Sequence, residues 1–170
     1  MKPLVFNSTP LIYLSKVGLS GIIENLQGEK MTSLLVKAEI VDKGKHKGVP
    51  DAIVLEKLFE NCVFKLCNPK DKLFLSRLSK THGLHAADAE ILALAKEHAG
   101  LAVIDDEVAR KTAKVYRISF VGTPYVLARA VFEGLLSKEQ AKAAFMGMIS
   151  SGWRCNVETY SKIIELIDKM

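Results

Sequence analysis

The sequence predicts an α/β fold in which helices cover both faces of a central, mainly parallel sheet, giving three layers. Short apolar segments alternate with amphipathic segments of about 10–15 residues, the order of strands and helices in such folds. Residues 101–104 (Leu-Ala-Val-Ile) are continuously apolar, as in a central parallel strand buried on both faces. Polar residues follow the ends of the predicted strands, where parallel sheets place their binding sites.

The individual elements are predicted from chain breakers and from apolar periodicity. The first strand, residues 3–6, stops at Asn7, and Pro10 suits the first turn of a helix capped by Ser8 or Thr9. Further helices are expected at about 19–26, 34–43, 51–60, 70–81, 86–98 and 107–115, from 123 onward, and at about 137–150 and 156–169. Further strands are expected near 31–32 and at 62–67, 101–104 and 118–121.

Composition is that of one folded domain. The chain has 170 residues, of which 49% are hydrophobic, so we expect a single domain over 1–170 with C-terminal helices from about 137 to 170. No apolar run approaches the roughly 20 residues that cross a bilayer. The first residues reach the polar Asn7 too early for a secretory signal, so a cytoplasmic protein without a membrane partner is expected.

The three cysteines do not indicate a disulfide framework. Their odd number and the absence of CxxC spacing argue against disulfides and against a structural zinc site. We interpret Cys62 and Cys67 as residues of a buried strand.

The charge balance allows an anionic partner without requiring one. The chain has 24 Lys and Arg against 19 Asp and Glu, a net charge of +5. The basic residues form two runs, Lys43, Lys45, His46 and Lys47 in the first and Arg110, Lys111, Lys114 and Arg117 in the second. Each run is explained either by solvated helix ends or by contacts with an anion.

Acidic and amide side chains occur where the sheet rule predicts a site. Asn7 follows the first strand, Asp105 and Asp106 follow residues 101–104, and Asp88 lies near the start of the 86–98 helix. Glu39 lies on the 34–43 helix. Because clustered carboxylates repel one another, a cation such as Mg²⁺ or Mn²⁺ would stabilise them. Singly, these acids are explained equally well by helix capping or by a surface position.

Five motifs, taken in order, resemble the PIN (PilT N-terminus) domain family, in its prokaryotic virulence-associated protein C-like branch. They are residues 7–12 (Asn-Ser-Thr-Pro-Leu-Ile), 36–40 (Val-Lys-Ala-Glu-Ile), 84–90 (Leu-His-Ala-Ala-Asp-Ala-Glu), 104–110 (Ile-Asp-Asp-Glu-Val-Ala-Arg) and 121–127 (Val-Gly-Thr-Pro-Tyr-Val-Leu). The resemblance covers nearly the whole chain.

The resemblance implies a PIN-like fold and a metal-dependent endonuclease of single-stranded RNA, often the toxin of a toxin–antitoxin pair and often a homodimer. It implies catalytic roles for Glu39, Asp88 and Asp106. The implied ligands of Mg²⁺ or Mn²⁺ are Asn7, Glu39, Asp88 and Asp106, with Asp105 as an extra or outer ligand. The pattern does not decide which of Asp105 and Asp106 faces the metal; Asp106 is favoured because a helical segment containing Arg110 follows it. The hydroxyl residues that it implies at the edge of the site are Ser8, Thr9 and Thr123, for which helix capping is the alternative. The basic runs add Lys43 and Arg110 as contacts to the RNA backbone.

Asn7 departs from the family pattern, which has Asp at the first acidic position. An amide still offers a carbonyl oxygen to a metal but brings no charge, so metal binding should be weaker. Two functions therefore remain open: a ribonuclease with weakened activity, and a degenerate PIN domain that binds RNA or a protein without cutting. A small-molecule enzyme is a third reading, and no cofactor motif supports it.

Overall fold

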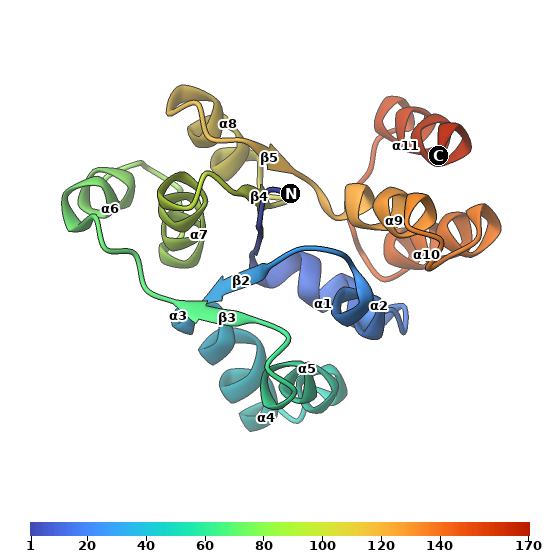
Figure 1. The fold of residues 1–170 in the computed structure, drawn as a ribbon, viewed down its shortest axis with the longest axis horizontal. Coiled ribbons are helices and arrows are strands. Elements are labelled where there is room, and N and C mark those ends of the chain that lie inside the picture. The colour runs from blue at the N-terminus through green and yellow to red at the C-terminus, as the bar shows by residue number, and fades with distance from the viewer.

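A computed structural model describes residues 1–170 and shows a five-stranded, all-parallel sheet (Figure 1). The strand order is β3-β2-β1-β4-β5. The central strand pairs on both sides, since Val5 lies opposite Met31 on one neighbour and Ala102 on the other. The strands are β1 (Leu4–Phe6), β2 (Lys30–Ser33), β3 (Lys65–Cys67), β4 (Leu101–Val103) and β5 (Phe120–Val121). The predicted α/β/α class is confirmed.

Helices cover both faces of this sheet. Helix α7 packs against β1, β2 and β4, with α6 and α8 beside it, whereas α1, α2, α9 and α10 lie on the other side (Figure 1). The helical elements are α1 (Ser8–Lys16), α2 (Ser20–Asn25), α3 (Leu34–Lys37), the π-helical turn η1 (Ala38–Asp42), α4 (Lys43–His46), α5 (Pro50–Glu60), α6 (Lys72–Ser79), α7 (Ala86–Glu97), α8 (Glu107–Val115), α9 (Thr123–Phe132), α10 (Lys138–Ser150) and α11 (Val157–Lys169). No helix is long and apolar enough to cross a membrane.

The core lies where strands and helices meet. All three residues of β1 are buried, and Ala102 and Val103 of β4 are fully inaccessible. The continuous apolar run at 101–104 was therefore interpreted correctly, because a strand between two helical layers has no solvent-facing side.

Three local predictions are wrong. The cap of α1 is Asn7, not Ser8 or Thr9, because β1 ends at Phe6 and the helix begins without an intervening loop. The strand expected at 62–67 is shorter and mostly exposed, since β3 is at the edge of the sheet and pairs on one side only; Cys62 lies outside it, exposed and with φ of 54°. The helix expected at 34–43 is divided by the turn η1.

A buried ion pair joins α9 to the turn before β2. Arg129 and Glu133 pair at 2.7 Å with side chains 8% and 5% exposed, and both also bond the backbone of Gln27. Arg129→Met should lower the free energy of unfolding by about 3 kcal/mol, because it leaves Glu133 buried without its partner. Urea unfolding measures this loss.

The matched control uses a pair with the same spacing on the surface. Lys162 and Glu158 of α11 also lie four residues apart, but both side chains are more than two-thirds exposed. Lys162→Met should therefore change the free energy of unfolding by about 0.5 kcal/mol or less. Equal effects of the two substitutions would contradict a stabilising role for the buried ion pair between Arg129 and Glu133.

Candidate active site

Several of the predicted polar residues meet at the carboxyl ends of β1 and β4. Asn7 and Asp88 are both buried, at 6% and 4% exposure, and the Asn7 side-chain amide donates to the Asp88 carboxylate at 2.5 Å. The Ser8 hydroxyl donates to Glu39 at 2.7 Å. The charge of Asp106 acts on Asp88 and raises its pKa. The structure thus brings Asn7, Ser8, Glu39, Asp88 and Asp106 into one cluster, called the acidic cluster below.

The orientation of the Asn7 side chain is fixed by its own helix. Its Oδ1 accepts the backbone N–H of Ser8 at 2.8 Å, which caps α1. A backbone N–H can only donate, so the amide oxygen must face Ser8 and the NH₂ group must face Asp88. Asn7 therefore presents a hydrogen-bond donor to the cluster at the position where an aspartate would present a second oxygen.

Asp88 carries the strongest electrostatic signal of the cluster. Burial raises the pKa of its carboxyl group above the ordinary value, and the neighbouring charge of Asp106 raises it further. The hydrogen bond from Asn7 and the proximity of His85 act in the opposite direction. The net effect is that the folded protein disfavours the ionised form of Asp88, compared with the same group in water.

Glu39 reaches the cluster from an irregular part of the chain. It lies in the π-helical turn η1 (Ala38–Asp42), which follows α3 directly. Single π-helical turns are rare and often occur at functional sites, since they change which residues face inward. Here the turn accompanies the contact between Glu39 and Ser8, two residues that are 31 positions apart.

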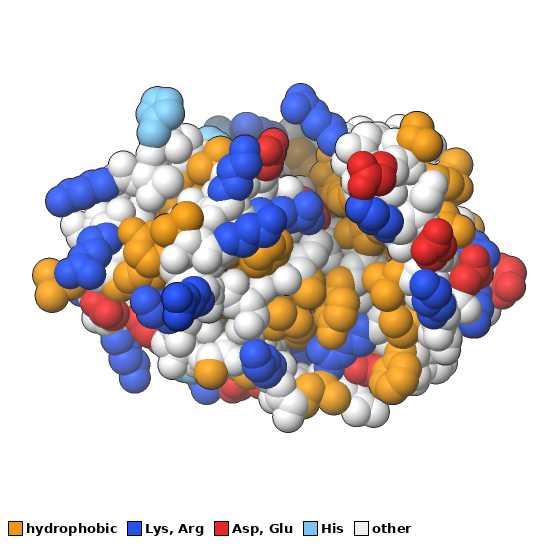
Figure 2. All heavy atoms as spheres, turned by 90° about the horizontal axis from the view of Figure 1, so that it is seen from above, with side chains coloured by type: hydrophobic (Ala, Val, Ile, Leu, Met, Phe, Trp, Pro, Cys, Tyr) orange, Lys and Arg blue, Asp and Glu red, His pale blue; other side chains and the backbone are white.

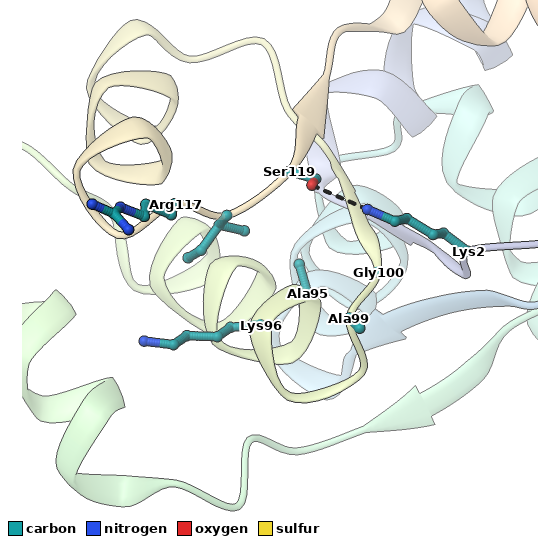
Figure 3. Close-up of a pocket in the computed structure, with 8 residues that line it drawn as sticks. Lys2, Ala95, Lys96, Ala99, Gly100, Arg117 and Ser119 are labelled. Carbon is teal, nitrogen blue, oxygen red and sulfur yellow. Dashed lines mark hydrogen bonds between the residues drawn. The ribbon is translucent and has the colours of Figure 1, made fainter.

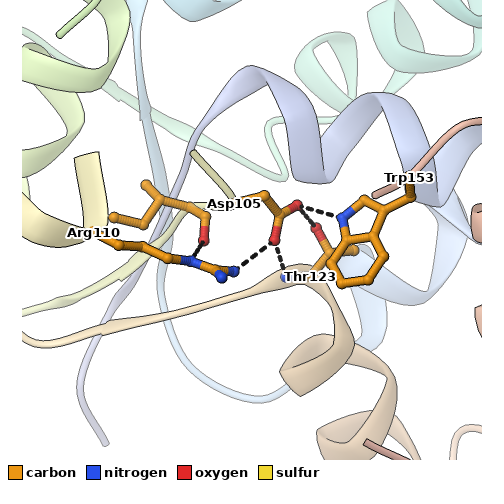
Figure 4. Close-up of polar contacts among 5 residues, drawn as sticks. Asp105, Arg110, Thr123 and Trp153 are labelled. Atoms are coloured by element: carbon orange, nitrogen blue, oxygen red, sulfur yellow. Dashed lines mark hydrogen bonds and ion pairs between the residues drawn. The ribbon is translucent and has the colours of Figure 1, made fainter. Parts of the chain in front are cut away.

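Asp106 and Asp105 have different environments, although they are adjacent. Asp106 caps α8, accepting the backbone N–H of Ala109 at 2.8 Å through one of its two oxygens. Asp105 has both oxygens occupied by donors of the protein (Figure 4). For this reason we leave Asp105 out of the ligand set proposed below.

Thr123 and Arg110, two predicted substrate contacts, are engaged by Asp105. Thr123 is fully buried and donates both its backbone N–H and its hydroxyl to that carboxylate. The Arg110 guanidinium pairs with Asp105 at 3.1 Å and also donates to the carbonyl of Ile104. Thr9 is half-buried beside the cluster and makes no side-chain hydrogen bond.

The structure also connects a residue that the sequence did not link to the site. The indole N–H of Trp153, from the loop between α10 and α11, donates to Asp105 at 3.1 Å (Figure 4). Trp153 is the only tryptophan of the chain, but no sequence spacing relates it to a position 48 residues earlier.

The acidic cluster does not form a complete metal site by itself. No three acidic, histidine or cysteine side chains stand in a geometry that encloses a metal. Magnesium, however, usually binds one or two carboxylates together with water and substrate phosphates. Asp88 and Asp106 are the candidate pair, since the charge of Asp106 acts on the buried Asp88 and helps to raise its pKa.

The remaining basic residues are distributed over the surface. Figure 2 shows many Lys and Arg side chains spread over one face rather than gathered in a single patch. Lys45 pairs with Glu56 and Lys111 with Glu107, whereas Lys43 is exposed and forms no ion pair. Lys43 lies four residues after Glu39, and so one helical turn from the cluster.

A pocket of about 230 Å³ lies at the other end of the sheet (Figure 3). It is lined by Lys2, Lys96, Arg117 and residues that directly precede β4 and β5, and no acidic residue lines it. Lys96 is directed to the ring of Phe74, 3.9 Å from its centroid. The pocket is at the amino ends of β1 and β4, opposite the acidic cluster, and we assign it no part in the chemistry.

The all-parallel sheet between two helical layers, with Asn7, Asp105 and Asp106 at the carboxyl ends of its strands, defines a three-layer α/β/α protein with a candidate site at that end. A family model described as a PIN domain matches residues 3–169, so the chain belongs to the PIN domain family, whose members are commonly metal-dependent nucleases. No protein with a curated description matches the chain.

Proposed function

We propose that this protein is a metal-dependent endonuclease of single-stranded RNA. The observation that carries the proposal is the buried Asp88 carboxylate, whose pKa is raised by burial and by Asp106 at the edge of the sheet. Such an excess of negative charge in a protected site is typical of groups that bind a cation or take part in proton transfer.

The proposed roles follow from the contacts in the cluster. Asp88 and the free oxygen of Asp106 would hold Mg²⁺ or Mn²⁺. When bound, the ion would activate water and neutralise charge on the phosphate. Glu39, oriented by the Ser8 hydroxyl, would accept the proton of the attacking water. Asn7 would not be a ligand, since its NH₂ group faces Asp88. The expected products carry a 3′-hydroxyl and a 5′-phosphate.

Exposed lysines near Glu39 would contact the RNA backbone. Lys43 and Lys47 lie on or directly after α4 and form no ion pair. We expect Lys43→Ala and Lys47→Ala each to weaken binding and to lower the slope of log affinity against log salt by about 0.7, the contribution of one phosphate contact on a single strand. Fluorescence anisotropy at several salt concentrations measures the slope.

Lys169, on the last turn of α11, serves as the control for this series. Lys169→Ala also removes one positive charge. In the sequence, Lys169 is far from every residue of the acidic cluster. An unchanged slope in Lys43→Ala and Lys47→Ala, or an equal fall in Lys169→Ala, would remove these lysines from the proposed RNA path.

The direct test is cleavage of a labelled single-stranded RNA pool with Mg²⁺, with Mn²⁺ and with a chelator. The proposal predicts cutting that needs the ion, that is weaker on single-stranded DNA, and that is lost in Asp106→Asn. Absence of cutting by folded protein, and by Asn7→Asp, under all of these conditions would contradict it.

A second function is favoured by one observation, the Asn7 amide donor directed at Asp88. This donor partly satisfies the carboxylate without a metal. A PIN domain of this kind would bind RNA or a protein without cutting. Binding that is equal with metal and with a chelator, without cleavage, would distinguish it from the nuclease.

The biological setting is proposed from the resemblance. We propose a cytoplasmic toxin that a partner antitoxin protein neutralises and that acts as a homodimer. Induced expression in a bacterial host, with Asp88→Asn as the inactive comparison, tests the toxin role, and light scattering of the purified protein tests the dimer.

A further inference from the structure

We infer that Asp105 is a positioning residue, and that Trp153 uses it to couple the C-terminal helices to the acidic cluster. This inference goes beyond the set of ligands and rests on the proposed function for its catalytic consequence. The feature behind it is a single carboxylate that receives donors from three separate parts of the chain.

The carboxylate of Asp105 is almost fully satisfied by protein groups. Its side chain is 9% exposed, and it accepts from the Thr123 backbone N–H at 2.9 Å, the Thr123 hydroxyl at 2.5 Å and Trp153 Nε1 at 3.1 Å. The Arg110 guanidinium completes the set at 3.1 Å (Figure 4). Hydrogen bonds to a charged acceptor are stronger than those between neutral groups. These contacts, called the Asp105 node below, therefore hold Arg110, Thr123 and Trp153 in one arrangement.

The Asp105 carboxylate and Arg110 lie close against Gly122. A Cβ atom at Gly122 would lie 3.0 Å from the Asp105 carboxylate and would overlap the Arg110 guanidinium. The turn between β5 and α9 therefore approaches the carboxylate closely enough for the Thr123 N–H to reach it, and Arg110 lies across the same turn. Side-chain space and hydrogen bonding thus converge on one geometry.

Trp153 brings a distant segment to the node. It lies between α10 and α11, and its ring packs edge-on to Phe145, with centroids 5.7 Å apart. Phe145 in turn stacks on Tyr160 of α11. The C-terminal helix pair is thereby connected, through one aromatic cluster and one N–H, to the residue that follows Ile104.

The Asp105 node affects the acidic cluster because Asp106 directly follows Asp105 in the chain. Asp106 caps α8 through Ala109 N–H, and its charge acts on Asp88. A peptide bond is planar, so fixing the carboxylate and backbone of Asp105 limits the directions in which Asp106 can point. Loosening the node should therefore free Asp106 before it unfolds the domain.

The test uses amide hydrogen exchange, which does not require activity. Trp153→Phe keeps an aromatic ring on Phe145 and removes the N–H, whereas Thr123→Val keeps the shape and removes the hydroxyl. Each substitution removes one hydrogen bond to the Asp105 carboxylate, which should loosen the helix cap that the neighbouring Asp106 makes. The Ala109 amide, which bonds Asp106, should therefore exchange about tenfold faster. The Ala102 amide, which bonds Ser119 across the sheet, should keep its rate.

Tyr160→Leu is the matched control. It disturbs the same aromatic cluster through Phe145 but removes no donor to Asp105. We expect it to leave exchange at Ala109 unchanged, even where it lowers the melting temperature. Unchanged exchange at Ala109 in Trp153→Phe, or an equal increase in Tyr160→Leu, would overturn the inference and leave Trp153 a packing residue.

Kinetics separate this inference from the proposed function. If wild-type protein cuts RNA, Trp153→Phe should lower kcat about tenfold with KM nearly unchanged, because the cluster and not the RNA path is displaced. If wild-type protein cuts nothing, the nuclease proposal fails, while the exchange experiment still decides whether Asp105 positions Asp106.

Discussion

Asn7→Asp should bind Mn²⁺ more tightly than the wild-type protein by about 10- to 100-fold, the range by which one partner of a metal site changes metal affinity. The new carboxylate can still cap α1 through one oxygen, while the other replaces the NH₂ group that now faces Asp88. Calorimetric titration with Mn²⁺ measures the gain. Cleavage of RNA should increase about tenfold or more, because the proposed reaction needs the bound ion.

The same substitution should destabilise the metal-free protein. It removes a donor to a buried carboxylate and places a like charge beside it, which should cost about 1–3 kcal/mol. Saturating Mn²⁺ should restore the melting temperature. Asn7→Asp should therefore lower the melting temperature in the absence of metal but not in saturating Mn²⁺.

Asn156→Asp is the control for Asn7→Asp. Asn156 also caps a helix, accepting the Thr159 N–H at the start of α11, and it is exposed. It should change neither Mn²⁺ affinity nor cleavage. If Asn7→Asp gains no affinity for Mn²⁺, the cluster is not a metal site and the binding module becomes the better description.

Asp88→Asn should lower cleavage by about 10²-fold or more, the scale on which the loss of one preorganised charged group acts. The same change should not lower the stability of the metal-free protein at neutral pH. An amide at position 88 can still accept from Asn7, and it removes a buried charge that the folded state disfavours. A loss of function without a loss of stability is therefore expected.

The pH dependence follows from the raised pKa of Asp88. The folded state holds the proton of this carboxyl more tightly than the unfolded state, in which the pKa is near its ordinary value of about 3.9. Its contribution to stability is therefore greatest below that value and falls as pH rises through the raised folded pKa. Urea unfolding from acidic to neutral pH, with a chelator present, should show this decline in the wild type and a smaller one in Asp88→Asn.

Asp42→Asn supplies the comparison for both experiments. Asp42 is exposed at the end of η1, so its substitution should alter neither cleavage nor the pH profile of stability. A stability loss in Asp88→Asn comparable to that of a core substitution would mean that the carboxylate has a structural role.

The sequence predicted the layers of the fold because its central strands and helices are strongly patterned. Residues 101–104 are apolar without interruption, and β4 is buried between helices. The strand at 62–67 was misjudged for a physical reason, since Val63, Phe64 and Leu66 are apolar but β3 ends up at an edge with one pairing partner. Apolar composition does not reveal how many neighbours a strand has.

The site was predictable as a set of positions and not as a set of contacts. The ends of β1 and β4 were marked by Asn7 and by the Asp105–Asp106 pair, and these residues do lie at the carboxyl edge. No local pattern could show which way the Asn7 amide points, because this depends on the cap that it makes. The same holds for Asp105, whose partner Trp153 is determined by packing of the C-terminal helices.

The two outer strands of the sheet, β3 and β5, bear on how copies of this chain could associate. Strand β5 has two residues and β3 has three, and the exposed Lys65 of β3 is paired with Glu29. Short edge strands are poor templates for joining the sheets of two copies, since few backbone groups are free, and on β3 a paired lysine must also be displaced. The proposed dimer should therefore form through helical surfaces, which would leave the carboxyl ends of the strands in each copy open to the proposed RNA substrate.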